Sequence, residues 1–339
     1  MIAPALNALW GLWRANRRDP RTILLFVALL LLVVSLTLPP IPLARNGANL
    51  LVVVDITGSM NTRDYVADGK PVSRLAMAKT KLKELLGELP CPSRVALGLF
   101  SERVTFLLFN PIEVCGNFGA VAGAVDAIDW REAWDGDSHV AAGIYRAVDI
   151  AKELDADLLF VTDGQEAPPL PASGGPRFEG KAGEVKGLLL GAGGYALSPI
   201  PKFDDSGIEI GFWGVDDVPH ENHSGLPPPG AENRPGYNAR NAPFGSEMPK
   251  GTEHLSSVRE PYLRTLAAGT GLGYAHMDPD SGIAGALLPA TRPRPARGVA
   301  DLRWVPGTIA LMVLLAVYLW APAIGYAVKH FHRRSNQKD

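Results

Sequence analysis

The sequence predicts an α/β fold in which helices cover both faces of a mostly parallel central sheet. Two observations support this prediction. Apolar runs of strand length alternate with helix-like stretches, and oxygen-bearing side chains follow two of these runs. Alternating strands and helices are typical of parallel sheets covered by helices. Ligands of such sheets bind at the carboxyl ends of the strands, so the polar residues after the runs are the first candidates for a functional site.

The first half of the central segment contains three expected strands and three expected helices. Residues 50–54 read Leu-Leu-Val-Val-Val and form the first expected strand. Residues 73–89 place apolar side chains on one stripe with lysines opposite, which indicates an amphipathic helix that ends before Pro90. The remaining elements expected here are strands at 94–100 and 104–109 and helices at 119–128 and 139–154.

The second half continues the alternation but also contains a long segment without periodicity. Residues 214–253 are rich in Gly, Pro and Asn, so we expect a loop. The two histidines of His220-Glu221-Asn222-His223 within it are interpreted as surface polarity rather than as metal ligands. The other elements expected here are strands at 158–162, 185–191 and 271–277, a Pro/Gly-rich loop at 168–180, a hairpin of 200–203 with 208–213, and a helix at 254–268.

Three short motifs gather oxygen ligands. Asp55-Ile56-Thr57-Gly58-Ser59 follows the first strand and supplies one carboxylate and two hydroxyls, although such residues also form ordinary turns. The segment Gly136-Asp137-Ser138-His139 adds the Ser138 hydroxyl, and Thr162-Asp163-Gly164 adds the Asp163 carboxylate after another strand. Oxygen ligands with few full charges suit Mg²⁺, which keeps part of its water shell.

In this order and spacing, the three motifs resemble the metal-ion-dependent adhesion site of von Willebrand factor A (vWA) domains, over residues 47–290. Ser138 stands where the family usually has Thr. The resemblance implies a Rossmann-like vWA fold and a divalent cation, with Mg²⁺ favoured and Ca²⁺ or Mn²⁺ as alternatives. A protein partner would supply a carboxylate to the remaining coordination position. The implied cation ligands are Asp55, Thr57, Ser59, Ser138 and Asp163.

Apolar segments near both ends predict two transmembrane helices, at 22–43 and 305–328. Four arginines precede the first segment and one closely follows it, which places residues 1–21 in the cytoplasm. The vWA domain would then lie in a bacterial periplasm and be joined by a linker at 291–304 to the second helix, with residues 329–339 as a cytoplasmic tail. A cleaved signal peptide is the alternative reading of the first segment.

The cysteine content and the net charge limit the possibilities further. Cys91 and Cys115 both fall in the segment assigned to the periplasm, where a pair is expected to form a disulfide. The bond would join the end of the first helix to the loop after the strand pair, and two unrelated buried thiols are the alternative. The formal net charge of −2 gives no indication of nucleic-acid binding.

Among membrane-anchored bacterial vWA proteins, the stretches VVVDITGSMNTRD and SPIPKFDDSGIEIGFWGVDD most resemble the MxaL type of methanol-oxidation clusters. That resemblance implies an accessory role in maturing methanol dehydrogenase by Ca²⁺ insertion, with that enzyme or other Mxa accessory proteins as partners. The alternatives are a BatA-like envelope-stress assembly scaffold and a metal-dependent hydrolase.

We expect no enzyme activity, because the sequence has no G-x-S-x-G, Walker A or H-E-x-x-H motif. Glu166 is expected to be a solvated loop residue rather than a catalytic base.

Overall fold

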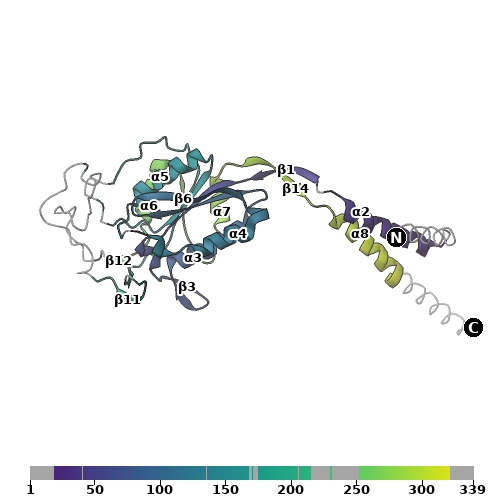
Figure 1. Cartoon of the computed structure of the whole chain (residues 1–339), viewed down its shortest axis with the longest axis horizontal. Coiled ribbons are helices and arrows are strands. Elements are labelled where there is room, and N and C mark those ends of the chain that lie inside the picture. Colours follow the sequence, from purple (N-terminus) through teal and green to yellow (C-terminus); the bar gives the residue numbers. More distant parts are fainter. Residues whose placement is uncertain are drawn as a thin grey trace, which may run out of the picture. The chain divides into compact units, whose positions relative to one another are not determined.

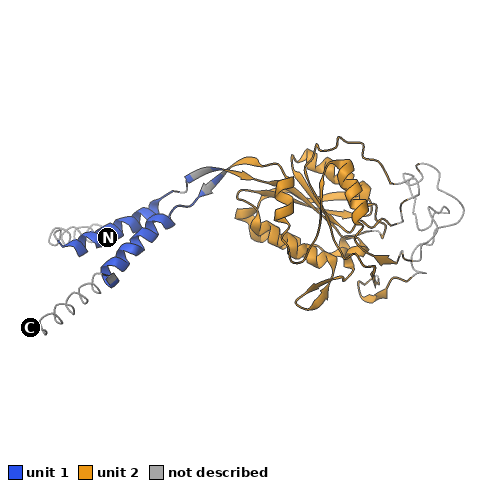
Figure 2. Ribbon diagram, turned by 180° about the vertical axis from the view of Figure 1, so that it is seen from behind, with its two compact units in different colours: residues 1–44, 297–339 blue, residues 45–296 orange. Residues whose placement is uncertain are grey.

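The computed structural model describes residues 19–39, 41–134, 136–167, 170, 175–204, 206–214, 230, 252 and 254–320. The chain divides into two compact units (Figure 2). One comprises residues 1–44 and 297–339, and the other comprises Arg45–Ala296.

A six-stranded sheet forms the centre of the larger unit (Figure 1). Its strand order is β13-β8-β7-β2-β5-β6, and every neighbouring pair is parallel except β5 with β6. The strands are β2 (Asn49–Asp55), β5 (Arg94–Ser101), β6 (Val104–Glu113), β7 (Asp157–Thr162), β8 (Gly187–Gly191) and β13 (Gly273–His276). The predicted fold class, an α/β fold with a mostly parallel sheet, is confirmed.

Helices cover both faces of this sheet, and β2 shows why. Alternate side chains of a strand point to opposite faces. Leu50, Val52 and Val54 pack in one apolar cluster, whereas Leu51 and Val53 pack in a second one. The first cluster includes side chains of α3 (Arg74–Glu88), α4 (Val114–Ala127) and α7 (Ala284–Leu287), and the second includes side chains of α5 (Val140–Glu153) and α6 (Glu260–Thr270).

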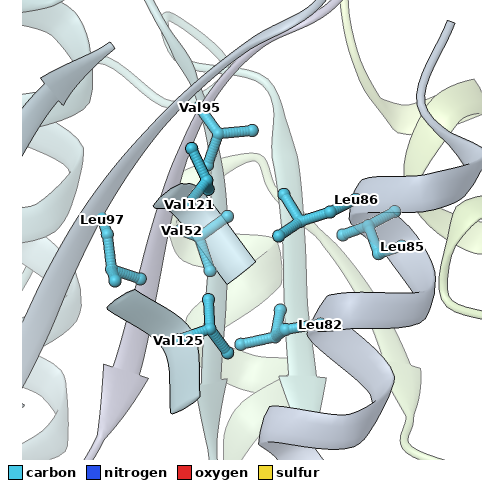
Figure 3. Close-up of a pocket in the computed structure, with 8 residues that line it drawn as sticks. All are labelled: Val52, Leu82, Leu85, Leu86, Val95, Leu97, Val121 and Val125. Carbon is cyan, nitrogen blue, oxygen red and sulfur yellow. The ribbon is translucent and has the colours of Figure 1, made fainter. Parts of the chain in front are cut away.

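The first cluster contains a small hollow between α3, α4 and the sheet (Figure 3). Every side chain that lines it is aliphatic, so this part of the core offers a ligand no polar group. The lining residues are Val52, Leu82, Leu85, Leu86, Val95, Leu97, Val121 and Val125.

The start of helix α3 at Arg74 is fixed by Ser73, whose hydroxyl accepts a hydrogen bond from Ala76 N at 3.1 Å.

Short strands lie outside the central sheet. The predicted hairpin forms as an antiparallel pair, β10 (Pro201–Phe203) with β11 (Glu209–Phe212). The remaining two-stranded pairs are β1 (Ile41–Gly47) with β14 (Arg294–Ala300), β3 (Tyr65–Ala67) with β4 (Lys70–Val72), and β9 (Ser198–Pro199) with β12 (Leu255–Ser256). Short helical turns are η1 (Gly58–Asn61), η2 (Trp130–Glu132) and η5 (Leu288–Ala290).

The described residues of the smaller unit include two apolar helices. Helix α2 (Pro20–Thr37) is long and apolar enough to cross a membrane. The predicted transmembrane segment, 22–43, extends beyond the end of this helix into β1. Helix α8 (Trp304–Leu315) is followed by a π-helical turn, η6 (Ala316–Trp320). The Ser35 hydroxyl donates to Arg303 O at 2.6 Å, which ties α2 to the start of α8. The rest of the predicted second span and both predicted cytoplasmic segments, apart from residues 19–21, lie outside the described residues.

Two predicted helix starts differ from the observed ones. Helix α4 begins with a turn at Val114, because the Glu113 carboxylate accepts hydrogen bonds from Cys115 N and Gly116 N. Asn117 then departs from helical backbone angles, with φ −124° and ψ 23°, so the predicted start at 119 lies just after this kink. Helix α6 begins at Glu260 because the preceding Leu255–Ser256 is a strand paired with β9. The predicted loop at 214–253 lies outside the described residues, apart from 214, 230 and 252.

The predicted disulfide between Cys91 and Cys115 is present, with a Cα–Cα distance of 6.0 Å. Its position differs from the prediction at one end, because Cys115 lies in the first turn of α4 and not in a loop. The bond therefore joins the residues after α3 to the start of the next helix on the same face of the sheet.

Candidate metal site

Asp55 is fully buried at the carboxyl end of β2, and neighbouring groups fix both of its oxygens. Oδ1 accepts hydrogen bonds from Thr57 N at 2.8 Å and from the Thr57 hydroxyl at 2.7 Å. Oδ2 accepts one from the Thr162 hydroxyl at 2.6 Å, at the end of the adjacent β7. The carboxylate is thus held rigidly at the edge of the sheet where ligands of parallel sheets bind.

Burial is the main reason that the pKa of Asp55 rises to about 7, and the charge of Asp163 adds to the effect. Hydrogen bonds from Thr162 and Thr57 oppose the rise but do not cancel it. Two carboxylates in one water-poor place make the ionised state costly unless a positive charge joins them. A cation bound here would stabilise the ionised form of Asp55.

Asp163 lies directly after β7 and is also fully buried. Its Oδ1 accepts a hydrogen bond from Gln165 N at 2.9 Å. Its Oδ2 accepts one from Arg74 Nη1 at 2.6 Å and one from the Ser256 hydroxyl at 3.0 Å. Unlike Asp55, this carboxylate already has a positively charged partner.

The structure brings the predicted hydroxyls to the same edge of the sheet. Ser59 Oγ lies 3.5 Å from Thr57 Oγ1. Ser138 is bridged to Glu102 after β5 and to Ala167 after β7. Because β2 lies between β5 and β7 in the sheet, Ser138 is held across the carboxyl end of β2.

The Ser138 hydroxyl is the observation that tests the site for a cation. It is buried and has no hydrogen-bond partner within the described part of the chain. Buried hydroxyls are normally partnered, so an orphaned one at the same edge of the sheet as two carboxylates and two further hydroxyls fits a hard cation. The five predicted residues are therefore a donor set suited to Mg²⁺ or Mn²⁺. A bound ion would supply a Lewis-acidic position that accepts an outside oxygen ligand.

Sequence reasoning missed Arg74, Asp64, Thr162 and Ser256. Arg74 is fully buried and bridges Asp163 to Asp64, with Nη2 2.6 Å from Asp64 Oδ2. A signal was present, because Arg74 lies four residues before Ala78 and eight before Leu82, on the apolar stripe of α3. A charged residue on such a stripe requires a buried partner.

The expectation that Glu166 is solvated was wrong. Its carboxylate accepts hydrogen bonds from Ala141 N at 3.0 Å and from the Tyr262 hydroxyl at 2.6 Å. Burial raises the pKa of Glu166, and these hydrogen bonds lower it to a smaller extent. The residue therefore joins the start of α5 to α6, and an acidic group at a helix N-terminus is electrostatically favourable there.

The pKa of Asp55 leads to a pH-dependence prediction. Asp55 holds its proton up to about pH 7, and a cation must displace that proton to bind. We expect Mn²⁺ affinity to be constant above about pH 7 and to fall roughly tenfold per pH unit below it. Calorimetric titration of the full-length protein at pH 5, 6, 7 and 8 measures this, and equal affinities at pH 5 and 7 would contradict it.

Comparison with known proteins adds a family assignment for part of the chain. Residues 50–165 match the von Willebrand factor type A domain family, and this segment contains all five predicted cation ligands. The fold is accordingly a vWA fold. No curated protein matches the chain.

Several solved structures are similar at low sequence identity. An aerotolerance-related membrane protein from Bacteroides fragilis NCTC 9343 is 16% identical, with 72% of this chain and 98% of that chain covered and a TM-score of 0.42. BatB from Bacteroides thetaiotaomicron is 16% identical, with 71% and 93% covered and a TM-score of 0.41. A membrane-spanning protein from Vibrio fischeri is also 16% identical, with 68% and 90% covered and a TM-score of 0.28.

Proposed function

We propose that this vWA-domain protein is anchored in a bacterial inner membrane and docks a partner protein in the periplasm through a divalent cation. Mg²⁺ is the cation that the donor set favours, since it offers two carboxylates and three hydroxyls. The proposed ligands are Asp55, Thr57, Ser59, Ser138 and Asp163.

The observation that carries the proposal is the buried, unpartnered hydroxyl of Ser138, held between the loops that follow β5 and β7. A cation at this edge would take oxygens from three separate loops. With only two carboxylates as ligands, it would keep enough Lewis acidity to gain from a third carboxylate. A glutamate or aspartate of a partner protein is the ligand that we propose for that position.

The membrane anchor and the compartment follow from separate features. Helix α2 has the length and apolarity of a spanning helix. The arginines that precede it favour a cytoplasmic N-terminus, and the Cys91–Cys115 disulfide is suited to an oxidising compartment. A reporter enzyme fused near residue 195, in the vWA domain, is expected to be active in the periplasm. Cytoplasmic activity of that fusion would overturn the orientation.

Partner identity rests on family resemblance alone. The resemblance to the MxaL type makes methanol dehydrogenase and other Mxa accessory proteins the first partners to test, with Ca²⁺ insertion into the enzyme as the process served. A BatA-like assembly scaffold is the alternative, and its partners would be other envelope proteins. The genes that surround the coding sequence distinguish these two readings.

Co-purification tests the docking mechanism. The full-length protein is extracted in detergent with Mg²⁺, and its bound proteins are compared with those of Asp55→Ala and of wild type in EDTA. We expect Asp55→Ala and EDTA to remove the same partner, and added Mg²⁺ to restore it to the wild type alone. An unchanged set of bound proteins in all samples would reject the mechanism.

The hydrolase alternative has a separate readout. It requires turnover of an ester or phosphate substrate that is lost in Asp55→Ala. The proposal expects no such turnover, because the hydroxyls of Thr57 and Ser59 are assigned as cation ligands and not as nucleophiles.

A further inference from the structure

Arg74 places a permanent positive charge beside the proposed cation site. Its side chain is fully buried at the first position of α3. Nη1 lies 2.6 Å from Asp163 Oδ2, and Nη2 lies 2.6 Å from Asp64 Oδ2. One guanidinium is thus shared between a proposed cation ligand and a carboxylate that is not assigned to the site.

The surrounding loops pack closely against this guanidinium and hydrogen-bond with it and with its partner Asp64. Gly193 has a φ of +111°, and a Cβ there would lie 2.4 Å from Arg74 Nε. The next residue, Gly194, donates its N–H to Asp64 Oδ2 at 2.8 Å. Arg74 also donates to the Ser256 hydroxyl at 2.7 Å. The charge is therefore fixed in place, and arginine stays protonated in proteins.

The charges of this buried group do not balance. Asp55, Asp64 and Asp163 carry three negative charges when all are ionised, and Arg74 carries one positive charge. A divalent cation would bring the sum to zero. Arg74 has two opposing effects here. It lowers the electrostatic cost of the buried carboxylates when no metal is bound, and it repels an incoming cation.

We propose that Arg74 sets the cation affinity of the site, acting as a resident positive charge that competes with the divalent cation for Asp163. This inference rests on the proposed cation function. Because the guanidinium holds affinity down, the carboxylate of a partner provides a decisive share of the binding of the ion. Arg74 is a positioning residue in this scheme and does not itself contact the cation.

The test compares two substitutions of opposite charge effect in the full-length protein in detergent, with Mn²⁺ as the probe. Arg74→Gln removes the positive charge and is expected to bind Mn²⁺ at least tenfold more tightly than wild type. Asp64→Asn removes a negative charge, leaves all five proposed ligands in place, and is expected to bind at least tenfold more weakly. Arg74→Lys keeps the charge but loses the forked geometry, so its affinity is expected to stay within threefold of wild type.

A purely structural role predicts a different pattern. Misplacing Asp163 would weaken Mn²⁺ binding in both Arg74 variants, so unchanged or weaker binding by a folded Arg74→Gln overturns the inference. If circular dichroism shows that Arg74→Gln does not fold, the Mn²⁺ affinity of Asp64→Asn tests the inference instead. An affinity of Asp64→Asn equal to or tighter than that of wild type would overturn the inference.

The two proposals fail in distinguishable ways. Absence of Mn²⁺ binding by wild type and by every variant would reject the cation function and this inference together. Wild-type binding that none of the charge changes alters would reject this inference alone.

Discussion

Asp55→Asn is expected to lower the Mn²⁺ affinity of the full-length protein at least a hundredfold. Asp55 is fully buried, and its two oxygens are fixed by Thr57 and Thr162. The substitution removes one of only two carboxylates among the proposed ligands, and a neutral amide cannot replace its charge. A hundredfold loss corresponds to about 2.7 kcal/mol of binding free energy. Calorimetric titration with Mn²⁺ above pH 7 measures it, where Asp55 in wild type is largely ionised.

Asp157→Asn provides the matched control. Asp157 has a fully buried side chain on the adjacent strand β7, but it lies at the opposite end of that strand from Asp163. There it accepts a hydrogen bond from Arg292 N at 2.8 Å. We expect its Mn²⁺ affinity to stay within twofold of wild type. Equal losses in the two variants would mean that general destabilisation, and not the loss of a ligand, weakens binding.

The double substitution Cys91→Ser and Cys115→Ser is expected to lower the unfolding free energy by about 3 kcal/mol. The disulfide closes a loop with a sequence separation of 24 and joins the residues after α3 to the first turn of α4. Removing it gives the unfolded chain more conformational freedom and leaves α3 and α4 connected by packing, by the Lys83–Asp126 ion pair and by the hydrogen bond from Lys79 to Ile128 O. For a domain of this size the melting temperature should fall by on the order of 10 °C.

Thermal unfolding of the full-length protein in detergent measures this effect, followed by circular dichroism. Wild type treated with a reducing agent should melt at the same temperature as the double variant. The same reagent should not change the melting temperature of the double variant. If the double variant melts at the same temperature as untreated wild type, the prediction is contradicted.

The sheet could be predicted from sequence because its strands are short apolar runs with clear ends. Leu50–Val54 and Leu158–Thr162 lie within β2 and β7. The positions of Asp55, Thr57, Ser59 and Asp163 at one edge could be predicted for a related reason, since they lie after strands whose carboxyl ends a parallel sheet brings together.

The parts that were missed depend on partners distant in sequence. Residues 255–256 fall in a stretch that reads as helical, yet they pair as a strand with β9. The link between β1 and β14 joins segments near the two ends of the chain. Arg74 could be noticed as a charge on an apolar stripe, but its partners Asp163 and Ser256 are 89 and 182 residues away. No local pattern identifies such partners.

Helices α3 and α5 belong to opposite layers of the domain, yet both begin at the same edge of the sheet. Arg74 opens α3 and contacts Asp163, and the Ser138 loop leads directly into α5. A ligand bound at this edge would therefore connect the two layers. At a concentration one hundred times its dissociation constant, such a ligand adds about 2.7 kcal/mol to the unfolding free energy. Binding at the site would thus increase the resistance of the whole domain to unfolding and to proteolysis.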